Sequence, residues 1–136
     1  MPDLRCILVT PERTVRDSPA EFVTVTLFDG EIGIARGHTP LVGRLGCGEM
    51  RITAGGRIER YYVEGGFVEV LGDVVSVLSP RVIAAEAIDA AVVREQLATA
   101  QERPARTPEL LDARQRTLCQ CHGQLRVARR REAAGT

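Results

Sequence analysis

The residues of this 136-residue chain best suited to chemistry are two thiols and an imidazole close together, Cys119, Cys121 and His122. Thiolate and imidazole groups are the usual ligands of zinc. A structural zinc site needs four ligands, however, and helical residues two positions apart point about 200° away from each other. These two points count against a zinc site, and the simpler expectation is that Cys121 is a small buried hydrophobe. A free-standing thiol- or metal-binding module that uses Cys119, Cys121 and His122 is kept as the alternative function.

The sequence contains few other residues or motifs that could serve catalysis or nucleotide binding. His38 stands in a turn-rich Gly-His-Thr-Pro segment, which favours a structural or interface role over catalysis. The three serines include no Gly-x-Ser-x-Gly element, and the absence of lysine excludes a Walker A phosphate loop and a Schiff base. The glycine-dense segment 30–37 lacks the spacing of a dinucleotide fingerprint. We therefore predict no catalytic residue, no metal site and no cofactor.

Composition and charge exclude further classes of protein. The 18 basic residues are all arginine and balance 18 acidic residues, and aromatic residues make up 4% of the chain. A nucleic-acid-binding protein needs a basic face and stacking rings, so we predict no nucleic-acid partner. No apolar segment reaches the roughly 20 residues of a spanning helix, and the N-terminus lacks the layout of a signal peptide. The sequence thus predicts a soluble, cytoplasmic protein with four reduced cysteines.

The glycine distribution divides the chain into two parts. Eleven of the 13 glycines lie within residues 30–72, and none lies within residues 73–122. Glycine marks turns between strands and is unfavourable inside helices. The chain is therefore expected to change from β to α structure at about residues 80–88.

The first part contains short runs of β-branched and aromatic residues separated by glycine turns. The predicted strands are residues 4–9, 22–28, 50–52, 58–63, 67–71 and 74–78. Gly55-Gly56 and Gly72-Asp73 match two-residue hairpin turns. Many short strands joined in this way indicate a sandwich or a barrel, and we predict a flattened antiparallel β-sandwich over residues 1–86.

The second part, residues 87–136, has helical spacing. Asp89 and Thr107 are suited to cap two helices, with Pro104 between them. Apolar residues recur every seven positions along the second helix, at Leu111, Leu118 and Leu125. Gly123 lies inside that helix at a cost of about 1 kcal/mol relative to alanine, which predicts a marginal hairpin able to repack. The complete prediction is an α+β fold in which the sandwich precedes a C-terminal antiparallel two-helix hairpin.

Residues 29–42, Asp-Gly-Glu-Ile-Gly-Ile-Ala-Arg-Gly-His-Thr-Pro-Leu-Val, resemble the signature of the epsilon subunit of the bacterial F-type ATP synthase. That family usually has Gly-Glu-x-Gly-Ile, two further residues, and then Gly-His-x-Pro-Leu-Leu. Three shorter segments, residues 9–13, 48–52 and 64–70, are also similar to the family. The resemblance covers most of residues 4–90 and is weaker over the helical hairpin.

The resemblance implies a non-catalytic central-stalk subunit of a proton-translocating ATP synthase. In this family the sandwich binds the gamma subunit and rests on the polar loops of the membrane c-ring, which couples proton-driven rotation to ATP synthesis. The hairpin folds against the sandwich or extends along gamma toward the catalytic beta and alpha subunits, where it restrains ATP hydrolysis. The implied location is peripheral, at the cytoplasmic face of the bacterial inner membrane.

The resemblance also implies which residues meet these partners. The interface with gamma and the c-ring is carried over to the glycine-rich signature, at Glu31, Gly33, His38, Pro40 and Val42. We interpret this segment as a rigid exposed loop that presents the Glu31 carboxylate outward. The arginine-rich second helix is expected to meet an acidic segment of the beta subunits through Arg114, Arg116, Arg126, Arg129 and Arg130.

Some members of the family bind ATP at the hairpin through an Ile/Leu-Asp-x-x-Arg-Ala motif. Here residues 88–94 read Ile-Asp-Ala-Ala-Val-Val-Arg, so the arginine is displaced by two residues, about 200° around a helix. Asp89, Arg94 and Arg126 are the candidate contacts that remain, and we expect this chain not to bind ATP.

Overall fold

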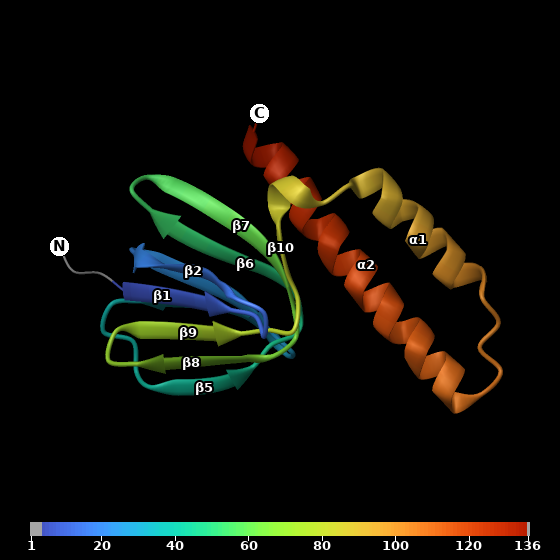
Figure 1. The fold of residues 1–136 in the computed structure, drawn as a ribbon, viewed down its shortest axis with the longest axis horizontal. Coiled ribbons are helices and arrows are strands. Elements are labelled where there is room, and N and C mark those ends of the chain that lie inside the picture. Colours follow the sequence, from blue (N-terminus) through green and yellow to red (C-terminus); the bar gives the residue numbers. More distant parts are fainter. Residues whose placement is uncertain (1–3, 136) are drawn as a thin grey trace.

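The computed structural model describes residues 4–135, which form two five-stranded β-sheets followed by a pair of α-helices (Figure 1). The first sheet has the order β2-β1-β9-β8-β5 and the second has the order β10-β7-β6-β3-β4. The first sheet consists of β1 (Leu4–Val9), β2 (Thr14–Ala20), β5 (Leu41–Arg44), β8 (Phe67–Leu71) and β9 (Val74–Leu78). The second consists of β3 (Phe22–Leu27), β4 (Gly30–Ala35), β6 (Cys47–Ala54), β7 (Arg57–Glu64) and β10 (Val82–Ala84).

The predicted sandwich is confirmed, and so is the hairpin that follows it. All six predicted strands are present, with two of them longer than expected at β6 and β7. Both predicted turns have the left-handed backbone that two-residue hairpins require, with φ of 59° and 76° at Gly55 and Gly56 and 58° and 64° at Gly72 and Asp73. The pairing is antiparallel throughout except between β1 and β9, which run parallel from Arg5↔Val74 to Val9↔Leu78.

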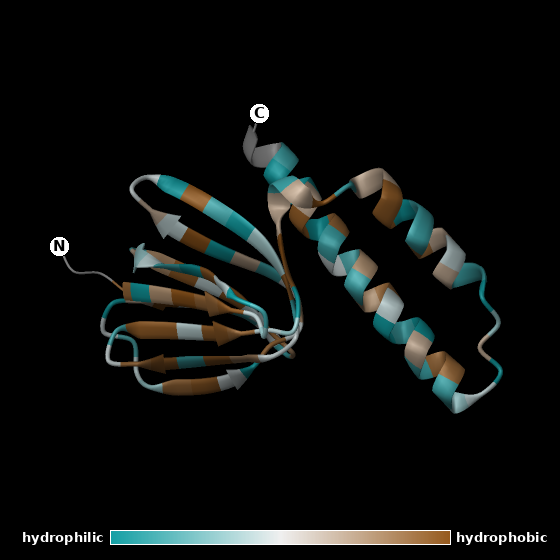
Figure 2. Cartoon of the chain, viewed as in Figure 1, coloured by the Kyte–Doolittle hydropathy of each residue, from teal (hydrophilic) through white to brown (hydrophobic). Residues whose placement is uncertain are grey.

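One hydrophobic core lies between the two sheets. Alternate residues of each strand point into it, as in β8, where Val68 and Val70 are fully buried and their neighbours are exposed. β6 of the other sheet contributes Met50 and Ile52 in the same manner. Figure 2 shows that β1, β9, β8 and β5 are mainly hydrophobic, whereas hydrophilic residues are frequent along the second helix.

The interpretation of segment 30–37 as an exposed loop is wrong for most of its length. Residues 30–35 form β4, which pairs with β3 from Leu27↔Gly30 to Phe22↔Ala35 and buries Ile34 completely. The glycines misled the prediction because they mark turns more often than strands. Gly33 serves close packing instead: a Cβ at this position would lie 2.4 Å from Cζ of the Phe22 ring.

Three further strands escaped prediction, namely β2, β5 and β10. β2 carries Pro19 and two charged residues, and it is tolerated because it lies at the edge of its sheet. β5 and β10 are also edge strands, and they have only four and three residues. Strands this short carry little periodic signal because they place at most two side chains on each face.

The helical hairpin follows a short 3₁₀ turn, η1 (Ala85–Ala87), and consists of α1 (Ala90–Glu102) and α2 (Pro108–Gly135). Asp89 caps α1, since its carboxylate accepts hydrogen bonds from the backbone N–H groups of Ala91 and Val92 at 3.1 and 3.3 Å. Thr107 Oγ1 caps α2 by accepting from the Leu110 N–H at 3.1 Å. Both predicted caps are therefore confirmed. None of the helices of residues 4–135 combines the length and the apolar character that a membrane span requires.

The predicted leucine seam does not form the main contact of α2. Leu111 is 42% exposed, and Leu118 and Leu125 are only partly buried. A second hydrophobic cluster forms instead between α1, α2 and the outer face of the second sheet, from Tyr62, Ala85, Ile88, Val93, Cys121, Val127 and Ala128. The seam failed as a prediction because α2 packs partly against a sheet, where small residues allow a closer approach than leucine.

Gly123 is a point of close backbone approach between α2 and the sandwich. A Cβ at this position would lie 2.9 Å from Tyr62 Cε1 on β7 and 3.0 Å from the carbonyl oxygen of Cys47 on β6. The prediction from Gly123 of a marginal hairpin able to repack stays a prediction, and the structure adds a packing role for this glycine. Its missing side chain is what allows the helix to lie directly on the sheet.

Candidate functional site: the sandwich–hairpin junction

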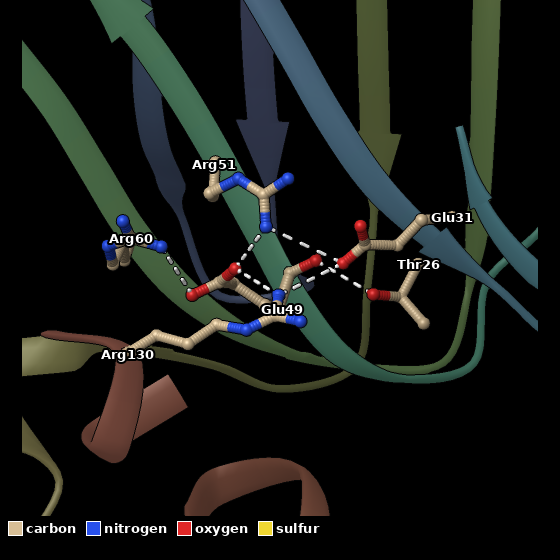
Figure 3. Close-up of polar contacts among 6 residues, drawn as sticks. All are labelled: Thr26, Glu31, Glu49, Arg51, Arg60 and Arg130. Carbon is tan, nitrogen blue, oxygen red and sulfur yellow. Dashed lines mark hydrogen bonds and ion pairs between the residues drawn. The ribbon is translucent and has the colours of Figure 1, made fainter. Parts of the chain in front are cut away.

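A completely buried carboxylate, Glu49, lies where α2 crosses the second sheet (Figure 3). Glu49 is in β6, and alternation along this strand puts it on the outer face together with Arg51, opposite the core residues Met50 and Ile52. Three guanidinium groups surround the carboxylate, from Arg51 at 2.5 Å, Arg60 at 3.0 Å and Arg130 at 2.8 Å. The first two come from the sheet, whereas Arg130 comes from α2.

Glu31 of β4 completes this cluster. Its carboxylate lies 3.1 Å from Arg130 and 3.5 Å from Arg51, and its side chain is 37% exposed. The expectation that Glu31 extends freely from a loop tip is therefore wrong in this conformation. The set of Glu31, Glu49, Arg51, Arg60 and Arg130 is called the junction network below.

The electrostatics of the junction network favour ionised side chains. Burial alone raises the pKa of Glu49, but hydrogen bonds from Arg130, Arg51 and Arg60 outweigh burial and bring the pKa below its usual value. The hydrogen bond to Glu49 likewise raises the pKa of Arg130. A buried charge without such partners would be strongly unfavourable. The network therefore binds an ionised Glu49 and depends on a side chain contributed by the hairpin.

The backbone around Glu49 is also held in place. Thr26 Oγ1 of the neighbouring β3 donates a hydrogen bond to the Glu49 carbonyl oxygen at 2.9 Å. The paired strands β6 and β7 are in register at Arg51↔Arg60, which places both guanidinium groups on the same face of the sheet as Glu49, where Arg51 binds Oε1 and Arg60 binds Oε2. Such an arrangement is suited to holding α2 in place, because one of the three cations that stabilise the buried Glu49 carboxylate comes from this helix.

The five residues expected to meet gamma and the c-ring lie along one stretch of chain that passes from the second sheet to the first. Glu31 and Gly33 are in β4, His38 and Pro40 are in the connection, and Val42 is in β5. The His38 ring is partly buried, and its Nδ1 lies 2.7 Å from the Thr39 carbonyl oxygen. Val42 is 73% exposed. Within this stretch, Val42 is the residue with the most accessible apolar side chain.

Val42 belongs to a larger exposed patch that the sequence did not predict. The outer face of the first sheet presents four large apolar side chains, Val42, Phe67, Leu71 and Leu78, which we call the apolar face. Phe67 and Leu78 are directly opposite in the pairing of β8 and β9, and both border a pocket of about 340 Å³. A detectable signal existed, because β8 and β9 are apolar on both faces, whereas a strand with one solvated face alternates.

The expected arginine contacts of α2 fall into two groups. Arg114 and Arg130 make contacts within the chain, Arg130 in the junction network and Arg114 by donating from Nη2 to the Gln101 carbonyl oxygen of α1 at 3.0 Å. The side chains of Arg116, Arg126 and Arg129 are exposed.

The candidate nucleotide contacts are not brought together. Asp89 is occupied as the cap of α1. Arg94 lines a pocket of about 260 Å³ beside Arg129, and Arg126 is not among its lining residues.

The candidate metal ligands are divided between the exposed and the buried side of α2. Cys119 and His122 are exposed, while Cys121 is 3% exposed in the second hydrophobic cluster, as expected for a small hydrophobe. Among residues 4–135, no three His, Cys, Asp or Glu side chains are grouped so that they could hold a metal ion.

A β-sandwich with an arginine-rich helical hairpin ionically bound to one sheet defines a two-part interaction module. Residues 3–85 match the family described as "ATP synthase, Delta/Epsilon chain, beta-sandwich domain". The ATP synthase epsilon chain of Rhodopirellula baltica is 43% identical over 126 residues, covering 93% of this chain and 98% of that one. The corresponding chain of Symbiobacterium thermophilum is 40% identical over 104 residues, covering 76% and 75%. The chain therefore belongs to the epsilon-chain family of ATP synthases.

The fold is also found in a solved assembly. A chain in the structure of the Euglena gracilis mitochondrial ATP synthase, comprising OSCP, F1 and c-ring, superposes with a TM-score of 0.74 at 24% identity. The match covers all of this chain and 83% of that chain. Both the sandwich and the hairpin are thus part of the shared fold.

Proposed function

We propose that this chain is a non-catalytic rotor subunit of the central stalk of a proton-translocating ATP synthase. Its sandwich binds the gamma subunit and the c-ring, and its hairpin restrains ATP hydrolysis when it reaches the beta and alpha subunits. The protein is held peripherally at the cytoplasmic face of the bacterial membrane through these partners. The observation that carries the proposal is the apolar face, which leaves four large side chains of a rigid sheet in solvent on the side opposite the hairpin.

The apolar face is the surface proposed for gamma. Exposed apolar patches rimmed by polar residues mark interaction sites, and aromatic anchors such as Phe67 dominate their energetics. Arg44 and Glu69 lie on the same face, as partners of Phe67 and Val42 in the pairing of β5 with β8. A sheet whose strands are paired along their length also resists deformation, as a subunit that transmits rotation requires.

The β4–β5 stretch is proposed for the c-ring. Gly33, His38 and Pro40 lie beside the apolar face along the chain, so one rigid sandwich can touch gamma and the ring together. Glu31 joins the junction network in the folded conformation. Its carboxylate loses the Arg130 contact whenever the hairpin leaves, which links the position of α2 to the surface that meets the ring.

The hairpin is proposed as the regulatory part. Exposed ion pairs contribute only about 0–1 kcal/mol each, so contacts of Arg116, Arg126 and Arg129 with an acidic surface would be reversible. In the folded conformation the junction network holds α2 on the sheet. Release and rebinding of the hairpin would then depend on a small difference in free energy between the junction network and the contacts with the acidic partner surface.

A binding experiment with the purified gamma subunit tests the proposal. Phe67→Arg puts a charge into the apolar face beside Leu78 and is expected to weaken the one-to-one complex by about 30-fold or more. Ile58→Arg is the matched control, because Ile58 is 53% exposed on the second sheet, outside the apolar face. Equal binding of the wild type and the Phe67 variant, or no binding of gamma by either, would contradict the proposal.

A further inference from the structure

Cys47 lies directly beneath α2 where the helix crosses the sandwich. It is the first residue of β6, on the same outer face as Glu49, and it packs against the second hydrophobic cluster. The close approach at Gly123 is to this residue, since a Cβ on Gly123 would lie 3.0 Å from the Cys47 carbonyl oxygen and 3.2 Å from its carbon. The backbone of α2 is therefore in contact with the backbone that carries the Cys47 thiol.

Cys119 precedes Gly123 by four residues, so the two lie on the same stripe of α2, one helical turn apart. Because Gly123 approaches the Cys47 carbonyl oxygen, this stripe places Cys119 on the side of α2 that faces the start of β6. Burial raises the pKa of Cys47 to about 11, and the contact with Cys119 contributes in the same direction. Cys119 is exposed and Cys47 is partly buried, so a reagent in solution reaches Cys119 first.

The other two cysteines differ from this pair in both position and access. Cys121 is buried in the contact between α1 and α2, about 200° around the helix from Cys119. Cys6 is completely buried in the core of the sandwich, and burial raises its pKa to about 12. Cys6 and Cys121 are therefore shielded from a reagent in solution, whereas Cys119 is exposed.

We propose that Cys47 and Cys119 form a reversible disulfide that joins the hairpin to the sandwich. The oxidant is a low-molecular-weight disulfide of the glutathione class. The site follows from the placement of the two cysteines on facing sides of α2 and β6, whereas its effect on the assembled enzyme, holding the hairpin in the folded conformation, rests on the proposed function.

The reaction proceeds by two exchanges. The Cys119 thiol loses its proton, and its sulfur attacks one sulfur of the reagent, whose S–S bond breaks and releases one reagent thiol. The Cys47 thiol then loses its proton and attacks Cys119 Sγ, which expels the second reagent thiol. Two protein thiols are thereby oxidised to one disulfide while one reagent disulfide is reduced to two thiols. Dithiothreitol reverses both steps.

The cross-link would act on the hairpin as a whole. It closes a long loop between β6 and α2, and such cross-links stabilise proteins mainly by restricting the unfolded chain. In the folded protein it ties α2 to the sheet beside Gly123, so that Arg130 and Glu49 cannot separate far. Oxidation is therefore expected to stop the opening of the hairpin, and reduction to restore it.

The test uses the full-length reduced protein, incubated with oxidised glutathione, quenched with acid and alkylated. Trypsin cleaves at arginine and leaves Cys119 and Cys121 in the same peptide, residues 117–126, while Cys47 is in residues 45–51. Non-reducing mass spectrometry is expected to show these two peptides linked in the wild type and in Cys121→Ser. The link is expected to be absent from Cys119→Ser, an exposed substitution that leaves the fold undisturbed.

A second measurement reports on the hairpin itself. Amide hydrogen exchange over residues 119–131 is expected to slow by at least about tenfold on oxidation and to recover with dithiothreitol. The proposal is overturned by a stable glutathione adduct on Cys119 with Cys47 unlinked, by a link that persists in Cys119→Ser, or by exchange that oxidation leaves unchanged. Each of these results is obtained without gamma, so the site can fail while the proposed function stands.

Discussion

Nη1 of Arg130 lies 2.8 Å from Oε1 of Glu49, although the two residues are 81 positions apart in the sequence. One belongs to the hairpin and the other to the sandwich. Glu49 is fully buried, whereas the Arg130 side chain is 39% exposed. The pair therefore links a fixed anion in the sheet to a cation that can leave with its helix.

Removing the cation tests this link. Arg130→Met keeps much of the aliphatic length of the side chain and removes the charge, so Glu49 retains only Arg51 and Arg60. We expect a loss of about 1–2 kcal/mol in the free energy of unfolding, because solvent screening at Arg130 keeps the effect below that of a fully buried pair. Urea unfolding measures this loss, and hydrogen exchange is expected to quicken over α2.

Arg129→Met is the matched control for this prediction, because Arg129 is the preceding residue and is exposed. Its free energy of unfolding is expected to stay within about 0.5 kcal/mol of the wild type. Equal losses in the two variants would show that the Arg130–Glu49 contact does not hold the hairpin. In the assembled ATP synthase, Arg130→Met is further expected to slow ATP hydrolysis, since it favours release of the hairpin.

Removing the anion is expected to be more damaging. Glu49→Gln leaves three guanidinium groups around a neutral amide, with no second carboxylate within reach of Arg60 in the junction network. Because this breaks a buried ionic cluster, we expect a loss of about 3–5 kcal/mol in unfolding free energy. Glu69→Gln, on the exposed face of β8, is the control. A Glu49 variant as stable as this control would mean that the network makes no net contribution.

Three of the five residues of the junction network could be placed together from the sequence. Alternation along a strand places Glu49 and Arg51 on one face, and the Gly55-Gly56 turn sets the register that brings Arg60 opposite Arg51. Arg130 could not be predicted in this way. Its position depends on where α2 crosses the sheet, which is decided by packing between distant parts of the chain.

The fold shows the same division between local and distant information. Strands such as β8 and β9 were predictable because they are short valine-rich runs next to glycine turns. β4 was not, because its two glycines indicate a turn locally, and only pairing with β3 and the packing of Phe22 on Gly33 make it a strand. The apolar face lies between these two cases: apolar residues on both faces of β8 and β9 were a signal in the sequence, but the grouping of Val42 with Phe67 and Leu78 is a property of the assembled sheet.

Acid should weaken the junction through Glu49. The pKa of this carboxyl lies below its usual value of 4.5 in the folded protein, so the folded state binds the proton less readily than the unfolded chain. The ionised carboxylate therefore stabilises the fold above about pH 4.5, and this contribution is lost as the pH falls through the lowered pKa. Urea midpoints measured from pH 7 to pH 3 are expected to fall more steeply in the wild type than in Glu49→Gln.

The comparison with Glu49→Gln is needed because a second carboxyl, Asp17, also has a lowered pKa and contributes to the loss of stability in acid. The hydrogen bond from Arg5 lowers the pKa of Asp17, and this pair is present in both proteins. The difference between the two pH profiles isolates Glu49. Parallel profiles would show that protonation of Glu49 does not contribute to acid destabilisation.

The contact at Gly123 leads to a prediction opposite to the usual rule for helices. Replacing glycine by alanine inside a helix normally stabilises it by about 1 kcal/mol. In Gly123→Ala, however, the new methyl group would lie 2.9 Å from Tyr62 Cε1 and 3.0 Å from the Cys47 carbonyl oxygen. The backbone oxygen cannot turn aside as a side chain can, so the helix must move away from the sheet. We expect a net loss of about 1–3 kcal/mol in unfolding free energy.

His122→Ala controls for the change in helix propensity, because His122 is the adjacent residue and its side chain is exposed. This variant is expected to be as stable as the wild type or slightly more stable. The decisive measurement is the comparison of the two urea midpoints, with the far-ultraviolet circular dichroism of each variant confirming that α2 remains helical. If Gly123→Ala raised the midpoint, the close approach of α2 to β6 would be refuted, and with it the basis for joining Cys47 to Cys119.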